Sequence, residues 1–191
     1  MTQESLFDKP TGTLREEHQV ILRVINVLGR LVERSEQGRG FERNALGECV
    51  EFFRSFADAC HHAKEEDLLF PLLQARGIPR DGGPIGVMLS EHQLARGFTK
   101  DMAGALEAYD REESNARDRF HSAARDYREL LTHHISKEDQ ILFTMGDQVM
   151  SEEDQSSLCK QFCGLCSKQF GGRTREELER MADTLEANWP A

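Results

Sequence analysis

Hydrophobic residues recur along most of the chain every three or four positions, which is the spacing of one face of an α-helix. Four long stretches have this spacing, and two shorter ones follow them. Their ranges are 13–36, 42–76, 84–111 and 114–145, and then 151–170 and 174–189. The sequence therefore predicts an all-α protein.

Helix-start and helix-stop residues define how these helices are joined. The first helix is expected to begin at Thr13, with Glu16 completing a capping box, and Pro71 is expected to kink or break the second helix. Because the connections between the four long helices are short, we expect an antiparallel up-down-up-down four-helix bundle. We expect this bundle to span residues 13–148 and two shorter C-terminal helices, in residues 149–191, to pack on it.

The charge and composition of the chain argue against several classes of partner. Its 191 residues include 34 acidic and 24 basic ones, and the net charge of −10 repels nucleic acid and anionic membrane surfaces. No apolar run approaches the ~20 residues of a membrane-spanning helix, and the first residues lack the pattern of a secretory signal. Three of the five cysteines, Cys159, Cys163 and Cys166, share one predicted helix face. We expect them to be reduced and packed, with a response to oxidants or binding of a further metal as the alternatives. The sequence thus predicts a soluble, cytoplasmic protein with no nucleic-acid or membrane partner.

An internal repeat relates the two halves of the predicted bundle. A Glu-His-Gln tripeptide occurs twice, and so does a His-His segment that leads to Lys-Glu, with separations of 73 or 74 positions. The repeat pairs His18 with His92, His61 with His134, and Glu65 with Glu138. Each helical hairpin therefore contributes one single histidine and one His-x-x-x-Glu pair.

The repeated residues have the types and the spacing of metal ligands. Positions i and i+4 of an α-helix lie on the same face, so the two members of a His-x-x-x-Glu pair can bind one ion together. In all four long helices the histidine falls on an otherwise apolar stripe, where an unpaired polar group costs ~2–7 kcal/mol. Imidazole and carboxylate suit iron, manganese or zinc, and carboxylates able to bridge favour a pair of ions in the core of a bundle.

The number of coordination positions indicates a reactive centre. Two six-coordinate ions offer about twelve positions, and four histidines, two bridging glutamates and an oxo or hydroxo bridge fill about ten of them. About one position on each ion stays open. We expect such a centre to react with small oxidants.

These residues resemble the pattern of the hemerythrin-like (HHE cation-binding) family, which is H…HxxxE…H…HxxxE on an antiparallel four-helix bundle. The resemblance covers about residues 13–148, and it is carried in order by the segments 15–18, 61–71, 83–92 and 134–139. It implies a non-haem di-iron centre, oxo- or hydroxo-bridged, with histidines as terminal ligands and glutamates as bridges. The ligands that it implies are His18, His61, His92 and His134, with Glu65 and Glu138 as the bridges.

The chain departs from the oxygen-carrying hemerythrins at one position. Those proteins have a second histidine four residues after the one on the third helix, where this chain has Arg96, so His62, His133 or a water has to substitute for it. Asp139 stands at the spacing that the oxygen carriers use, but the internal repeat favours Glu138 as the ligand. The ligand set is more similar to those of four-histidine, two-glutamate bacterial hemerythrin-like and iron-centre repair proteins.

Other histidines and a tyrosine lie near the predicted centre in sequence. One step along an α-helix turns a side chain by about 100°, so His62 and His133 are expected to face neighbouring helices or solvent. His121 is expected at the surface. Tyr127 shares the stripe of His134 and is expected to pack in the core, with hydrogen bonding or electron donation near the iron as the alternative.

Two functions follow from this reading, and the sequence leaves both open. The first is a redox protein that binds or reduces a small diatomic molecule or a peroxide, namely oxygen, nitric oxide or hydrogen peroxide. If it turns these molecules over, it is an oxidoreductase. The second is a non-catalytic oxygen or iron sensor or storage protein that signals through its C-terminal helices. A zinc-only structural role fits least, because structural zinc prefers closed tetrahedral sites. No motif identifies an electron donor or an oligomeric state.

Overall fold

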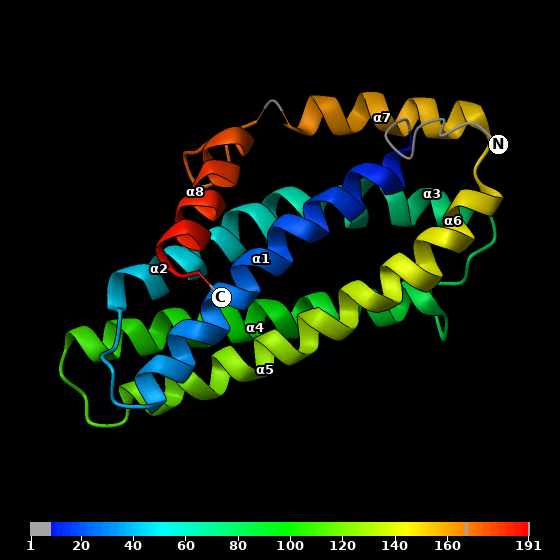
Figure 1. The fold of residues 1–191 in the computed structure, drawn as a ribbon. Helices are drawn as coiled ribbons and strands as arrows, with labels where there is room; N and C mark the ends of the chain where they lie inside the picture. Colours follow the sequence, from blue (N-terminus) through cyan, green and yellow to red (C-terminus); the bar gives the residue numbers. More distant parts are fainter. Residues whose placement is uncertain (1–8, 167, 191) are drawn as a thin grey trace.

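The computed structural model describes residues 9–166 and 168–190, and within these ranges the chain is helical without any β-strand (Figure 1). The prediction of an all-α protein is confirmed. In chain order the elements are α1 (Pro10–Glu36), α2 (Arg43–Phe52), the π-helical η2 (Phe53–His62) and η3 (Glu65–Leu69), α3 (Phe70–Ala75), α4 (Pro84–Asp110), α5 (Ala116–Lys137), the π-helical η4 (Glu138–Leu142), α6 (Phe143–Val149), α7 (Glu152–Cys166) and α8 (Arg175–Asn188).

The start of the first helix differs from the prediction. α1 begins at Pro10, so Thr13 lies inside the helix and does not cap it. Proline favours the first helical position because its fixed φ suits the helix and its missing N–H is not needed there. Pro71 likewise lies in the first turn of α3, directly after the π-helical η3, and the helical path continues across it.

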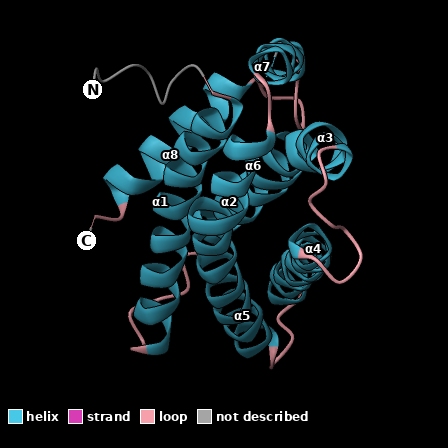
Figure 2. Cartoon of the chain, turned by 90° about the vertical axis from the view of Figure 1, so that its right-hand side faces the viewer, coloured by secondary structure: helices cyan, strands magenta, loops and turns pink. Residues whose placement is uncertain are grey.

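The long helices lie beside one another, and the C-terminal helices cover one side of them. α4 and α5 run side by side, and α7 and α8 lie on the face of α1, α2 and α3 that is turned away from α4 (Figures 1 and 2). None of the helices in the described ranges combines the length and the apolarity that crossing a bilayer requires.

The buried apolar side chains form two separate groups. The larger core includes Ile21, Leu28, Phe52, Phe56, Phe120, Tyr127 and Leu178. The smaller core includes Leu14, Leu69, Phe70, Leu73, Phe143 and Phe162. Four long helical paths run through the molecule: α1, α2 to α3, α4, and α5 to α6. In each of them a buried histidine or glutamate lies between the two cores, and Lys64 is buried there as well, so a buried polar layer separates the cores.

Two predictions outside the polar layer are corrected by the structure. The prediction that His121 lies at the surface is wrong, because it is buried, with its Nε2 3.0 Å from the Ser35 hydroxyl. The prediction that the C-terminal cysteines are packed is wrong for Cys163, which is exposed; Cys159 is half-buried, and the side chain of Cys166 lies outside the described residues.

Candidate metal centre

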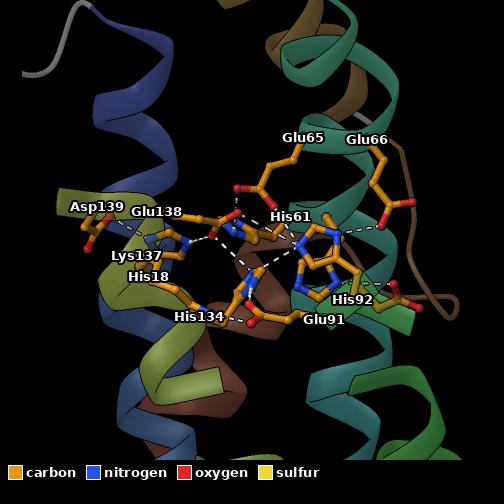
Figure 3. A network of polar contacts seen from close by, with 12 residues as sticks. His18, His61, Glu65, Glu66, Glu91, His92, His134, Lys137, Glu138 and Asp139 are labelled. Atoms are coloured by element: carbon orange, nitrogen blue, oxygen red, sulfur yellow. Dashed lines mark hydrogen bonds and ion pairs between the residues drawn. The ribbon is translucent and has the colours of Figure 1, made fainter. Parts of the chain in front are cut away.

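The buried polar layer contains all six residues that the sequence implies as ligands (Figure 3). Each of them is at most 1% exposed. They come from every long helical path: His18 from α1, His61 from η2, Glu65 from η3, His92 from α4, His134 from α5 and Glu138 from η4.

The possible ligand atoms fall into two groups, and within each group they lie within 4.8 Å of one another. The first group is His18, His61, Glu65 and Glu138, and the second is His62, Glu65, His92 and His134. Glu65 belongs to both groups. One of its carboxylate oxygens lies 3.6 Å from Nε2 of His61, and the other lies 3.4 Å from Nε2 of His92. Glu65 is therefore placed between two sites.

Glu138 has a similar intermediate position. Its Oε2 lies 3.3 Å from Nε2 of His18 and 3.2 Å from Nε2 of His134, which belong to different groups. Nε2 of His92 is 3.0 Å from Nε2 of His134. Two nitrogens that both bind the same ion, each at about 2.1 Å and with a right angle between the two bonds, are about 3.0 Å apart. The spacing of these imidazoles therefore fits a shared ion.

A second ring of residues orients the histidines. Each of four imidazoles has its Nδ1 at 2.7–3.0 Å from a carboxylate on a neighbouring helical path. The pairs are His18 with Asp139, His61 with Glu17, His92 with Glu66, and His134 with Glu91. A histidine whose Nδ1–H donates to a carboxylate presents Nε2 to the centre, as metal-binding histidines do.

This ring of orienting carboxylates was not predicted, although the sequence contains a signal for it. Glu17 and Glu91 each precede a predicted histidine ligand, and Glu66 and Asp139 each follow a predicted glutamate ligand, so the internal repeat includes them. Asp139 contacts Nδ1 of a histidine instead of pointing into the centre (Figure 3).

The electrostatics of the centre fit a cation. All four carboxylate oxygens of Glu65 and Glu138 are buried and receive no hydrogen bond from the described residues. Burial raises the pKa of Glu65 well above its usual value, and the nearby charge of Glu138 raises it further. Burial would also raise the pKa of Glu138, but the imidazoles of His134 and His18, whose Nε2 atoms lie 3.2 and 3.3 Å from its Oε2, outweigh it and hold that pKa well below its usual value. A bound cation allows both carboxylates to be ionised and gives their oxygens a partner.

Comparison with known proteins agrees with this geometry. The family model described as the hemerythrin HHE cation binding domain matches residues 9–146. The chain belongs to the hemerythrin HHE family. The match ends within α6, so α7 and α8 lie beyond the matched residues.

The curated relatives of this hemerythrin HHE protein carry no description of function. "Uncharacterized protein Rv1995" and "Uncharacterized protein MT2051" of Mycobacterium tuberculosis, and "Uncharacterized protein Mb2018" of Mycobacterium bovis, are each 25% identical to it over 158 residues. These alignments cover 83% of this chain and 61% of each relative, so the chain spans about three fifths of their length. No solved structure gives a significant match.

Two histidines of this hemerythrin HHE chain adjoin predicted ligands in sequence, and only one of them lies where it was expected. His133 is exposed, as predicted, whereas His62 is 2% exposed and lies in the second ligand group. His62 ends the π-helical η2, and a π-helical turn holds more residues than an α-helical one, so successive side chains are turned by less than ~100°. His61 and His62 can therefore both face the polar layer.

A cavity of about 630 Å³ adjoins this side of the centre. It lies between η2 and α4, and His62, Arg96 and Tyr127 are part of its lining. Tyr127 packs in the larger core, with its ring 4.6 Å from that of Phe53, and burial raises the pKa of its hydroxyl. The cavity therefore reaches the second ligand group at His62.

Proposed function

We propose that this chain is a non-haem di-iron protein that binds or reduces oxygen, hydrogen peroxide or nitric oxide. The observation that carries this proposal is the pair of ligand groups that share Glu65, because a shared carboxylate holds two ions close together. The proposed metal ligands are those that the sequence implies, namely His18, His61, Glu65, His92, His134 and Glu138.

The donor set supports iron over a structural metal. Imidazole with carboxylate is a common ligand combination for iron, and structural zinc takes four ligands in a closed tetrahedron, often including cysteine. When bound, two iron ions supply both the coordination positions for a small oxidant and the electrons that its reduction requires.

The residues of the chain orient the ligands and keep the site dry. The carboxylates at Nδ1 fix the imidazoles with Nε2 toward the centre, and the two glutamates keep the two sites at a fixed separation. The larger and smaller cores close the polar layer on both sides and exclude bulk water from it. The cavity beside His62 is the proposed route for a small molecule.

The architecture that goes with this function is also a proposal. We infer that residues 13–148 form the metal-binding up-down-up-down bundle with antiparallel neighbours, and that residues 149–191 form a helical extension on it. The polar layer supports this division, because every proposed ligand lies in the first of these ranges.

The experiment that tests the proposal is anaerobic loading of metal-free protein with Fe(II), followed by an iron count and optical spectra. We expect two irons per chain, and a spectral change when oxygen, peroxide or nitric oxide is added. His134→Ala is expected to lower the iron content, and His133→Ala is the matched control because His133 is an exposed neighbour. Absence of iron, or equal iron content in both variants, contradicts the proposal.

A second candidate function is a sensor or storage protein that signals through its C-terminal helices. It is favoured by one contact: Nε of Arg175, on α8, lies 3.5 Å from the Glu17 carboxylate that holds Nδ1 of His61. Repeated turnover of oxidant with a chemical reductant identifies an oxidoreductase. Stoichiometric binding with a structural change in α8 identifies a sensor.

A further inference from the structure

We propose that His62 is a fifth imidazole ligand of the centre, bound to the ion of the second group, and that Arg96 is a positioning residue that holds it through Asp58. This inference rests on the proposed function, since it needs a metal centre. It goes beyond the four-histidine, two-glutamate ligand set, and it gives the two ions different surroundings.

The first observation is that His62 is buried without a hydrogen-bond partner. Its side chain is 2% exposed, and neither ring nitrogen makes a hydrogen bond to any described residue. Leaving a buried polar group without a partner is destabilising. Because His62 lies in the second ligand group with Glu65, His92 and His134, an ion there gives it the missing partner.

The second observation is that His62 also faces a carboxylate. The other four histidines have a carboxylate within 3.0 Å of Nδ1, and Nδ1 of His62 faces Oδ1 of Asp58 at the longer distance of 3.4 Å. Asp58 lies one turn earlier in the same helical path. With its other nitrogen on the ion, His62 becomes the fifth histidine held between a carboxylate and the centre.

Arg96 is placed to stabilise this arrangement. Its Nε lies 2.7 Å from Asp58 and its Nη2 lies 2.8 Å from Glu66, so one guanidinium holds the carboxylates behind both His62 and His92. The two imidazoles are stacked, with their ring centroids 3.8 Å apart and their planes at 15°. Arg96 itself follows His92 by one turn of α4, but it contacts carboxylates instead of entering the polar layer.

The two halves of the repeat differ at this position. Aligned from the glutamate ligands, His62 corresponds to Ile135, which is buried in the larger core and has no ligand atom. The first group therefore has two imidazoles, and the second has three. The two ions are expected to differ in their spectra.

The test of His62 is anaerobic loading of the full chain with ⁵⁷Fe(II), followed by an iron count and Mössbauer spectra. We compare His62→Ala and His62→Phe with His133→Ala as the matched control. The phenylalanine variant keeps a flat ring against His92, so a change in both variants reports the lost nitrogen and not the lost packing. Far-UV circular dichroism checks that each variant is folded.

We expect the parent chain to hold two irons with two distinct Mössbauer components of equal area. Both His62 variants are expected to lose one iron, or to bind it at least tenfold more weakly, with a change in only one component. His62 is not a ligand if both variants keep two irons and the parent spectrum. A parent chain that binds no iron overturns the proposed function as well, so the two failures are distinguishable.

The positioning role of Arg96 is tested with Arg96→Met. We expect this variant to shift the same Mössbauer component as the His62 variants and to weaken that iron about tenfold, as loss of outer hydrogen bonds does at other metal sites. Lys100→Met is the control, since Lys100 is a cation on the same helix that lines the same cavity. The role is excluded if that component is unchanged in Arg96→Met, or if Lys100→Met changes it equally.

Discussion

The buried ion pair between Lys64 and Glu17 is expected to make Lys64→Met one of the most destabilising single changes in the metal-free protein. Both side chains are 0% exposed, and Nζ of Lys64 lies 2.5 Å from Oε1 of Glu17. Burial alone would raise the pKa of Glu17, but hydrogen bonds and charges of His61 and Lys64 outweigh it and lower that pKa to about 2. The carboxylate is therefore held ionised in the interior by its partners.

The expected magnitude follows from the burial of both partners. Removing one member of a buried ion pair costs about 3–5 kcal/mol of unfolding free energy, because the remaining charge, here that of Glu17, loses its nearest opposite charge. For a chain of this size each kcal/mol lowers Tm by about 2–4 °C, so Lys64→Met is expected to lower Tm by roughly 6–20 °C. Replacing both partners also removes the buried carboxylate charge of Glu17, so the double variant Glu17→Gln/Lys64→Met is expected to be more stable than Lys64→Met.

Urea unfolding of the metal-free variants, followed by circular dichroism, measures these differences. Arg23→Met is the control, because Arg23 pairs with Asp183 at the surface, where an ion pair contributes about 0–1 kcal/mol. The reasoning fails if Lys64→Met unfolds within about 1 kcal/mol of the parent. It also fails if the double variant is no more stable than Lys64→Met.

The remaining predictions concern the ligands, the smaller core and the metal itself. Asp139→Asn is expected to weaken iron binding about 10–100-fold, because the Asp139 carboxylate holds Nδ1 of His18. Glu138→Gln is expected to weaken iron binding further, and competition with a chelator measures both affinities. An Asp139 effect larger than that of Glu138 would reverse the assignment of the ligand. Phe143→Ala is expected to lower the free energy of unfolding in urea by about 3–5 kcal/mol, since the Phe143 side chain is fully buried in the smaller core and stacked on His18. A decrease below about 1 kcal/mol would contradict that packing. Removal of iron by a chelator is expected to lower the Tm measured by calorimetry, because the ions link helices that carry different ligands and bind only the folded chain. An unchanged Tm would show that no ion was bound in the folded state.

The sequence predicts the helical class well because the apolar spacing is long and regular. It also identifies the six proposed ligands, since polar residues on apolar stripes are costly and an internal repeat selects the same positions twice. The start of α1 is mispredicted because Thr13 and Pro10 offer competing start signals, and the proline determines the first turn.

The surroundings of the ligands are harder to predict, for a physical reason. Glu17 and Glu66 orient histidines on other helical paths, and periodicity within one helix carries no information about its neighbours. His62 is misplaced by the sequence because its expected direction assumes an α-helical turn. The π-helical η2 changes that direction, and no residue type in the segment signals the change.

The separation of the apolar interior into two cores has a consequence for how the protein unfolds locally. Because the layer between the larger and the smaller core consists of histidines, carboxylates and Lys64, apolar packing does not run continuously from one end of the molecule to the other. Without an ion, the amides around each core are expected to exchange with solvent as two independent groups, each with its own opening free energy. With ions bound to ligands from all four helical paths, opening at one end must break the coordination shared with the other. The two groups are then expected to merge into one cooperative unit.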